Sequence, residues 1–412
     1  MMLLGFQNSF LFAQLVYNNG ATMAIKSGAI VIVRTESLSN AAGVLDNAGL
    51  LQIEGDITNN AIANGGGANG IYKIQNNWIN NATFTANNSQ VELYGNNQLI
   101  TGTSVTDFYQ LTLTGTGIKS QTINANVTNL LELNDRELAT DNFKMTILNT
   151  NVNAITRTTG FVSSIANGRL SRLMASIGNY LFPVGSSSGV SRYRPLTITP
   201  TSLSTQQYDV RLANVDPNTE GFNRNIKAPD ICEVNPNYFH HINRITGISP
   251  VNLGFFYDPV TDGNWVSVAH WQNIPQWQNT GTAIAGVAAP FNTLTISGWN
   301  DFTYSPFALV NLGPNAAISG NSTFCAGGST SITFTGTPNA VISYNINGGG
   351  TQTITLDVFG NATLNTGNLS ITTVFNLLSA AMPATPACVQ LFTSQVTVTV
   401  NPNPSTSPMF HD

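Results

Sequence analysis

The sequence predicts an all-β protein with an N-terminal parallel β-solenoid, a middle β-sandwich and a C-terminal β-sandwich. Charged residues make up only 8% of the 412-residue chain, against roughly 25% in an ordinary soluble domain. Gly, Asn, Thr and Ser are plentiful, and these residues suit turns and strand edges better than helices. Short alternating apolar segments also recur about every 20 residues in the first third of the chain.

The same composition argues against several classes of function. The net charge is −5 and only 15 residues are Lys or Arg, whereas binding to nucleic acid needs clustered cations that neutralise phosphates. No nucleic-acid partner is therefore predicted. Intrinsic disorder is disfavoured because apolar residues reach 42% and the net charge is small.

Residues 1–13 are predicted to be a secretory signal peptide. The stretch is mainly apolar, and Leu11 and Ala13 occupy the −3 and −1 positions of a cleavage site before Gln14. No Lys or Arg precedes the apolar run, which is consistent with a start further upstream. A buried first strand is the alternative interpretation. No segment has the ~18 uninterrupted apolar residues of a transmembrane helix.

Residues 14–150 are predicted to form the solenoid. In such a fold each coil contributes an alternating strand, and the next coil pairs with it in parallel. The predicted inward residues of successive coils are Val31/Val33, Leu51/Ile53, Tyr72/Ile74, Val91/Leu93, Leu111/Leu113, Leu131/Leu133 and Met145/Ile147. The outward column holds Gln52, Lys73, Glu92, Thr112 and Glu132. Lys73 and Glu92 are thus expected on neighbouring coils, about 5 Å apart.

Asn and Gly between these segments favour the solenoid, because both tolerate the left-handed backbone of tight corners. Stacked Asn side chains also form hydrogen-bonded ladders. The alternative is a string of hairpins in a sandwich. Hairpins need connections of about two to five residues, and most gaps here are longer.

Residues 151–313 lose the period and are predicted to form an aromatic-rich antiparallel sandwich, with Pro and Gly between alternating runs. Four of the 5 Trp residues lie here: Trp265, Trp271, Trp277 and Trp299. Two interpretations stay open. The rings form an exposed platform for a glycan, or they fill the core, as large aromatic side chains usually do.

A metal site is not predicted. The metal-binding side chains in the middle region are His240, His241, His270 and Cys232. Neighbouring residues of a strand point to opposite faces, so His240 and His241 are not expected to chelate one ion. No HExxH motif is present. No cofactor is predicted either.

Residues 314–402 are predicted to form one compact sandwich, and the Pro- and Ser-rich residues 403–412 a linker. Cys325 and Cys388 flank the module, so a disulfide between them is expected in a secreted protein. Cys232 then remains as a buried free thiol.

Several segments resemble those of known surface proteins. They are Phe324-Cys325, Tyr344-Asn-Ile-Asn-Gly348, Thr385-Pro-Ala-Cys388, Phe182-Pro-Val-Gly185 and Arg192-Tyr-Arg-Pro195. The C-terminal module resembles the PKD-like, immunoglobulin-like repeats of large secreted surface proteins of Bacteroidota, and the N-terminal part is similar to the same proteins. The resemblance implies export through type IX secretion. Such proteins usually end in a sorting domain, which is not recognisable in this sequence.

The predicted function is that of a non-catalytic secreted or cell-surface structural protein: an adhesin, a stalk or a subunit of an extracellular filament. Self-association and contacts with surface glycans or other cell-surface proteins are the expected interactions. No catalytic residue is predicted.

The alternative function is a polysaccharide-binding module or a glycan-active β-solenoid enzyme. The charged candidates on the coils are Glu54, Asp56, Lys73, Glu92, Glu132, Asp135 and Arg136. A glycosidase needs two carboxylates in a defined arrangement, and none of these residues forms such a pair in the predicted register.

Overall fold

A computed structural model describes residues 15–34, 36–67, 69–304, 306–383 and 388–404. The predicted signal peptide lies outside this range, as does most of the predicted linker. The described residues form two compact units. The first contains the chain up to Arg224 together with Asn235–Leu309, and the second contains Asn225–Val234 and the chain from Val310 onwards.

The prediction of an all-β protein is confirmed. The described residues contain no α-helix, and their one helical element is the short 3-10 helix η1 (Pro217–Glu220). Alternation of buried and exposed residues along the strands explains this choice, because a period of two fits a strand and not a helix. In β4, for example, Leu51 and Ile53 are buried between two half-buried neighbours.

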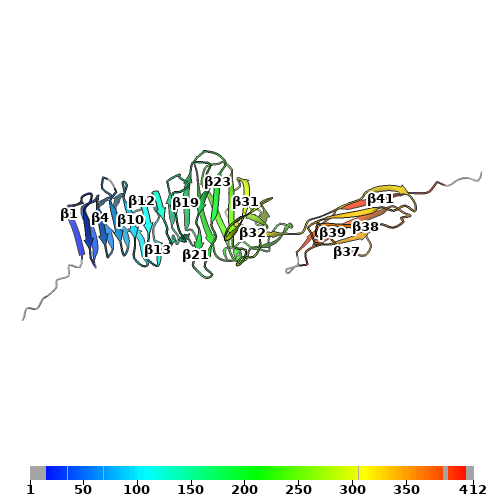
Figure 1. Ribbon diagram of the computed structural model, residues 1–412, viewed down its shortest axis with the longest axis horizontal. Coiled ribbons are helices and arrows are strands. Elements are labelled where there is room, and N and C mark those ends of the chain that lie inside the picture. The colour runs from blue at the N-terminus through cyan, green and yellow to red at the C-terminus, as the bar shows by residue number, and fades with distance from the viewer. Residues whose placement is uncertain (1–14, 35, 68, 305, 384–387, 405–412) are drawn as a thin grey trace, which may run out of the picture. The chain divides into compact units, whose positions relative to one another are not determined.

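The first unit begins with a parallel β-solenoid of about 7 turns, seen at the N-terminal end of Figure 1. Each coil contributes strands to three rows. The strands are β1 (Leu15–Ile25), β2 (Ile30–Val33), β3 (Ser37–Asn47), β4 (Leu50–Ile53), β5 (Ile57–Asn59), β6 (Ile62–Asn64), β7 (Ile71–Ile74), β8 (Trp78–Asn80), β9 (Thr83–Thr85), β10 (Gln90–Leu93), β11 (Gln98–Gly102), β12 (Thr106–Leu113), β13 (Ile118–Gln121), β14 (Ala125–Glu132), β15 (Glu137–Ala139), β16 (Lys144–Ile147), β17 (Ile155–Thr156), β18 (Phe161–Ser163) and β19 (Arg169–Met174).

The first row contains β2, β4, β7, β10, the second halves of β12 and β14, and β17. It confirms most of the predicted inner stack. Val31 pairs with Leu51, Leu51 with Tyr72, and Tyr72 with Val91. The column continues through Leu111 to Leu131. From Leu51 onwards these side chains are buried, because each coil covers the apolar residues of the coil before it.

The predicted position of Met145 and Ile147 at the end of this stack is wrong. Met145 pairs with Ala125 and Ile147 with Val127. These residues belong to the third row, which contains β6, β9, the first halves of β12 and β14, β16 and β19. The true successor of Leu131 is Ile155 on β17. Between Leu131 and Met145 the chain turns two corners, so a shorter step along the sequence marks a change of row. Parallel pairing also runs beyond residue 150, since β16 pairs in parallel with β19.

A buried asparagine ladder runs through the first coils. Asn18 Nδ2 donates to Asn40 Oδ1 (2.8 Å), Asn40 Nδ2 to Asn59 Oδ1 (3.0 Å), and Asn59 Nδ2 to Asn80 Oδ1 (2.9 Å). The ladder ends because the next residue in the column is Gly102. Gly102 has a φ of +126°, and a Cβ there would lie 2.0 Å from the Asn80 carbonyl oxygen. Neutral amides thus satisfy one another along the ladder, except at its end, where Asn80 Nδ2 is buried without a hydrogen-bond partner.

The remaining strands of the first unit pair in antiparallel fashion. From β19 one sheet continues through β24 (Gln206–Ala213), β26 (Phe239–Thr246), β32 (Pro306–Leu312), β28 (Ser267–Trp271) and β29 (Trp277–Asn279). A second sheet contains β20 (Tyr180–Phe182), β23 (Leu196–Pro200), β27 (Val251–Tyr257), β31 (Phe291–Trp299) and β30 (Ile284–Ala288), and a small hairpin joins β21 (Gly185–Ser186) to β22 (Arg192–Tyr193). One continuous apolar core extends from the solenoid into this region.

The second unit has a core of its own, which contains Ile332, Phe334, Ile342 and Phe375. Its smaller sheet contains β33 (Ala316–Ser319), β35 (Ser331–Gly336) and β38 (Asn361–Asn365). The larger sheet contains β34 (Ser322–Cys325), β41 (Gln395–Asn401), β39 (Thr373–Ala381), β36 (Val341–Ile346), β37 (Gln352–Thr355) and β40 (Val389–Leu391). The last strand, β25 (Ile231–Val234), pairs with the end of β32.

The predicted disulfide between Cys325 and Cys388 is wrong. Cys388 is bonded to Cys232, with their Cα atoms 5.5 Å apart, and Cys325 is an exposed free cysteine. Cys325 ends β34, which pairs in parallel with β41. Cys232 lies on β25, a segment that belongs to the second unit although it precedes the rest of that unit by some 80 residues. Proximity along the sequence was therefore a poor guide to proximity in space.

Peptide mapping without reduction is expected to recover one linked pair that contains Cys232 and Cys388. Cys325 should react with iodoacetamide in the native, unreduced protein, because its side chain is exposed. A linked pair of Cys325 and Cys388 peptides would contradict the structure. Prior treatment with a reductant provides the control, since all three cysteines then become alkylated.

Candidate functional site

The first row of the solenoid begins with an open edge at β2. Its partner is β4, and no other described strand pairs with it. The strand reads Ile-Val-Ile-Val, and Ile30, Val31 and Ile32 are 67%, 39% and 41% exposed. An unpaired edge offers backbone N–H and C=O groups to another strand, and apolar side chains increase that tendency.

A groove lies beside this edge, with a volume of about 510 Å³. Val16 and Met23 of β1, Val31 and Val33 of β2, and Leu38 of β3 contribute apolar walls. It exists because β1 pairs with β3 but not with β2, which leaves the first row one strand short among the described residues. Arg34 and Glu36 lie at its rim. We call β2 and this groove the open end.

The charged residues predicted on the coils take part in local hydrogen bonds and ion pairs. Lys73 Nζ lies 3.2 Å from Glu92, which confirms the predicted pairing across coils. Thr114 Oγ1 also donates to Glu92 (2.7 Å). Glu132 accepts hydrogen bonds from Gln110 and Thr112, both 2.7 Å long.

The other coil candidates are similarly engaged. Arg34 lies 3.5 Å from Glu54. The Asp56 carboxylate accepts a hydrogen bond from the backbone N–H of Asn77 (2.8 Å). Asp135 and Arg136 form an ion pair with each other.

The interpretation of the Trp residues as an exposed glycan platform is wrong. Trp265, Trp271 and Trp277 are buried, and Trp299 is half-buried. Trp271 and Trp277 meet edge to face at 5.4 Å between ring centroids. Trp299 packs against the ring of Phe307 at 5.7 Å. These rings fill the core because burying so much apolar area stabilises the fold more than exposing it.

The histidines serve separate structural contacts. His240 Nε2 lies 2.9 Å from the backbone oxygen of Arg194, and His241 Nε2 lies 2.8 Å from Glu220. As predicted, the two neighbours point to opposite faces of β26. Burial lowers the pKa of both rings to about 4. Among the described residues, no three His, Cys, Asp or Glu side chains gather in a way that would hold a metal ion.

Glu220 forms an ion pair with Arg211, whose side chain is buried. Burial works against its charged form, but hydrogen bonds from His241 and Arg211 outweigh it and lower the Glu220 pKa to about 2. A carboxylate held as an anion in this way stabilises the fold and is a poor general acid at neutral pH.

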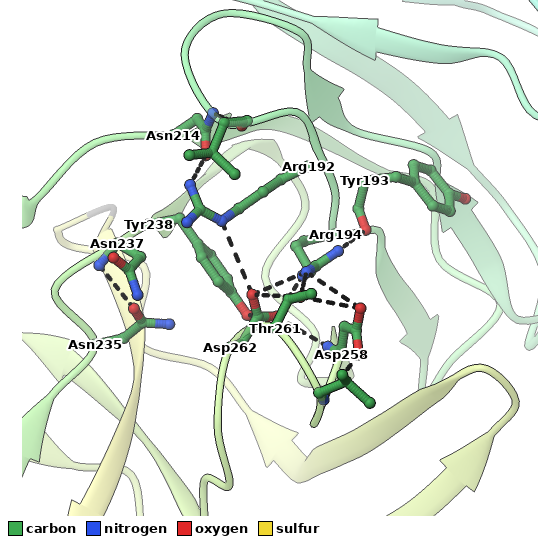
Figure 2. A network of polar contacts seen from close by, with 12 residues as sticks. Arg192, Tyr193, Arg194, Asn214, Asn235, Asn237, Tyr238, Asp258, Thr261 and Asp262 are labelled. Carbon is green, nitrogen blue, oxygen red and sulfur yellow. Dashed lines mark hydrogen bonds and ion pairs between the residues drawn. The ribbon is translucent and has the colours of Figure 1, made fainter.

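A second polar network surrounds Asp262 in the loop after β27 (Figure 2). Arg194 donates to Asp262 through both Nε and Nη2, the latter at 2.8 Å, and Tyr238 Oη donates at 3.0 Å. Arg194 and Asp262 are only 5% and 7% exposed. The backbone N–H of Asp258 also donates to Asp262 (2.9 Å). These contacts hold the loop that follows β27 in place.

Comparison with models of known protein families, with curated proteins and with solved structures finds no match to this chain. Function must be argued from the surfaces of the molecule itself. Within the described residues, no helix has the length and hydropathy of a membrane span.

Sequence reasoning missed a second groove, which has a volume of about 560 Å³. It follows the outer side of the second row of strands, which includes β8, β11, β13, β15 and β18. We call it the lateral groove. Leu99, Ser120, Ala139 and Ser163 form one outward column along it, in successive strands β11, β13, β15 and β18. Glu137 and Asp141 lie beside this column. The sequence contained a signal for this groove, because the repeat of about 20 residues that aligns the first row also aligns these outward residues.

Proposed function

We propose that this protein is a non-catalytic structural protein of the cell exterior, an adhesin, a stalk or a filament subunit, which self-associates through its open end. The observation that carries the proposal is the unpaired edge of β2 with its exposed Ile30, Val31 and Ile32. Proteins usually protect such edges with charged residues, Pro or bulges. β2 contains none of these.

A second copy of the chain is the occupant that best fits the open end. Its β2 offers the same unpaired edge and the same apolar residues, so two copies related by a twofold axis satisfy each other. At the far end of the solenoid β19 pairs with β24 and Val162 of β18 bridges to Val184, whereas the two-residue strand β17 pairs only with β14 among the described strands. This contact therefore closes a pair of molecules, and a filament needs a further interface. Low charge also weakens repulsion between copies.

An extracellular location is part of the proposal. The Cys232–Cys388 disulfide is typical of oxidising compartments, and the neutral polar composition suits a stacked β-scaffold. The resemblance to type IX-secreted surface proteins of Bacteroidota supports the same location. We also propose that the middle region is a sandwich and the second unit an immunoglobulin-like module, since in each case apolar residues of two sheets share one core.

Replacing Ile32 by lysine tests the assembly. Ile32 lies opposite Gln52, in the outward column of the first row, so the change leaves the inner stack intact. A charge on an edge strand opposes pairing with another strand. We expect the dissociation constant of the dimer, measured by sedimentation velocity, to rise at least about tenfold.

The control is Ile248→Lys, which introduces the same charge at an isoleucine that is 84% exposed between β26 and β27. It should leave the association unchanged. A second variant, Val31→Asp, places a carboxylate inside the groove and should weaken the dimer as well. Monomers at high concentration for the unaltered chain, or dimers in all variants, would refute the proposal.

A further inference from the structure

We propose that the lateral groove binds an extended, neutral, hydroxyl-rich glycan chain. The groove and the open end lie on different rows of the solenoid and share no lining residue. Glycan binding is thus independent of self-association, and either activity can be absent without the other.

The dimensions of the groove suit an extended chain. Its lining runs from Asn77, just before β8, to Ser163–Ile165 at the end of β18. That distance covers five neighbouring coils, and four steps between strands span roughly 19 Å. Ser186 at the end of β21 and the following residues Ser187 and Ser188 contribute one end of the lining. A compact ligand would contact only a fraction of this length.

Some polar side chains of the groove lack partners among the described residues, whereas others, such as Asn77 and Gln98, are hydrogen-bonded to neighbouring coils. Neither the Glu137 nor the Asp141 carboxylate has a hydrogen bond or ion pair with any described residue. The Ser163 hydroxyl, in a residue that is only 9% exposed, likewise has no side-chain partner within the described chain. Buried or half-buried acceptors of this kind gain most from a ligand that brings its own O–H donors.

The charge of the site selects against anionic ligands. No Lys or Arg contributes to the lining. Burial, together with the negative charge of Glu137, raises the pKa of Asp141, so the two carboxylates already repel each other. Donation of hydrogen bonds by neutral hydroxyl groups relieves this repulsion, whereas a uronate, sulfate or phosphate would add to it.

The floor of the groove distinguishes a glycan from a peptide. Strands β8, β11, β13 and β15 are internal members of a parallel sheet, so their backbone groups are already paired with neighbouring coils, and β18 at the end of the sheet is bridged to Val184 through Val162. An extended peptide that binds by strand addition needs an open edge. A glycan needs side-chain acceptors and apolar contacts for its C–H faces. Exposed Leu99, Ile118 and Ile165 supply those contacts.

The test uses the full chain and titration calorimetry with four neutral probes: cellohexaose, xylohexaose, maltohexaose and chitohexaose. At least one is expected to bind. Glu137→Gln and Asp141→Asn should each weaken that binding about tenfold, because a hydrogen bond to a charged acceptor is stronger than one to a neutral amide. Ala139→Tyr, which fills the floor from an outward position, should abolish it.

Asp107→Asn is the matched control, since it removes an exposed carboxylate on the third row and should leave binding unchanged. Hexagalacturonate and spermine test the role of charge. Binding of spermine alone would show that the groove is a cation site, and preferential binding of hexagalacturonate would contradict the charge argument. Failure of all four neutral probes, or equal binding by Ala139→Tyr, would also overturn the proposal. None of these results bears on dimer formation, which sedimentation measures separately.

Discussion

Replacing Asp262 by alanine is expected to lower the free energy of unfolding of the first unit by about 3–5 kcal/mol. Asp262 accepts hydrogen bonds from Arg194, Tyr238 and the backbone of Asp258, and it is almost completely buried (Figure 2). Its removal leaves the Arg194 guanidinium buried without its main counter-charge. The change in the free energy of unfolding comes mainly from leaving the charge of Arg194 buried and unpaired, and less from the lost attraction between Arg194 and Asp262.

Urea denaturation followed by tryptophan fluorescence measures this effect, because every Trp of the chain lies in the first unit. Asp258→Ala is the control. The Asp258 side chain is more exposed and lies 3.9 Å from Arg194, so its loss should cost only about 1 kcal/mol. The double variant Arg194→Met with Asp262→Leu should recover much of the stability, because no charge is then left buried. Equal losses for Asp262→Ala and Asp258→Ala would contradict this account.

Acidification from pH 7 to pH 4 is expected to destabilise the first unit by roughly 3 kcal/mol for each of His240 and His241. Burial lowers the pKa of both rings from 6.5 to about 4 in the folded protein. Between these values the unfolded chain binds protons that the folded protein does not. The stability is therefore complete above about pH 6.5 and is lost progressively as the pH falls towards 4. Below pH 4.5 protonation of Glu220 acts in the same direction.

Urea denaturation at a series of pH values tests this prediction. His240→Phe keeps an aromatic ring beside Phe255, which lies 5.6 Å from the His240 ring, but cannot bind a proton. The variant is expected to lose stability overall, since the bond to the Arg194 carbonyl disappears, yet its stability should depend on pH about half as steeply. An unchanged slope would show that His240 does not titrate as described.

The solenoid could be predicted because the apolar pattern that defines each coil is short and recurs along the sequence. Each inward residue recurs after one coil, so Leu51, Tyr72 and Val91 are aligned by the sequence alone. The prediction failed where the repeat changes length, at Met145. It also gave no sign that Lys119 points inwards, where four oxygens lie within hydrogen-bond distance of its ammonium group, including Gly95 O (2.8 Å) and Gln98 Oε1 (2.7 Å).

Contacts between distant segments were beyond such reasoning. The Cys232–Cys388 bond and the Arg194–Asp262 pair join residues 156 and 68 positions apart, and no period relates them. Burial of the Trp residues depends on how two sheets face each other, which alternation within one strand does not specify. The lateral groove was missed for a different reason: its residues lie on the outward side, where small and polar residues look like ordinary surface.

The disulfide also determines how the chain carries tension. If the protein is pulled by its two ends, as a surface stalk is, force passes along the backbone to Cys232, crosses to Cys388 and continues to the C-terminus. The 156-residue interval between these cysteines is bypassed, which withholds about 500 Å of potential extension. The strands of the second unit that lie within this interval are thereby shielded from the load, whereas β40 and β41, which follow Cys388, bear it, as do the solenoid coils before Cys232.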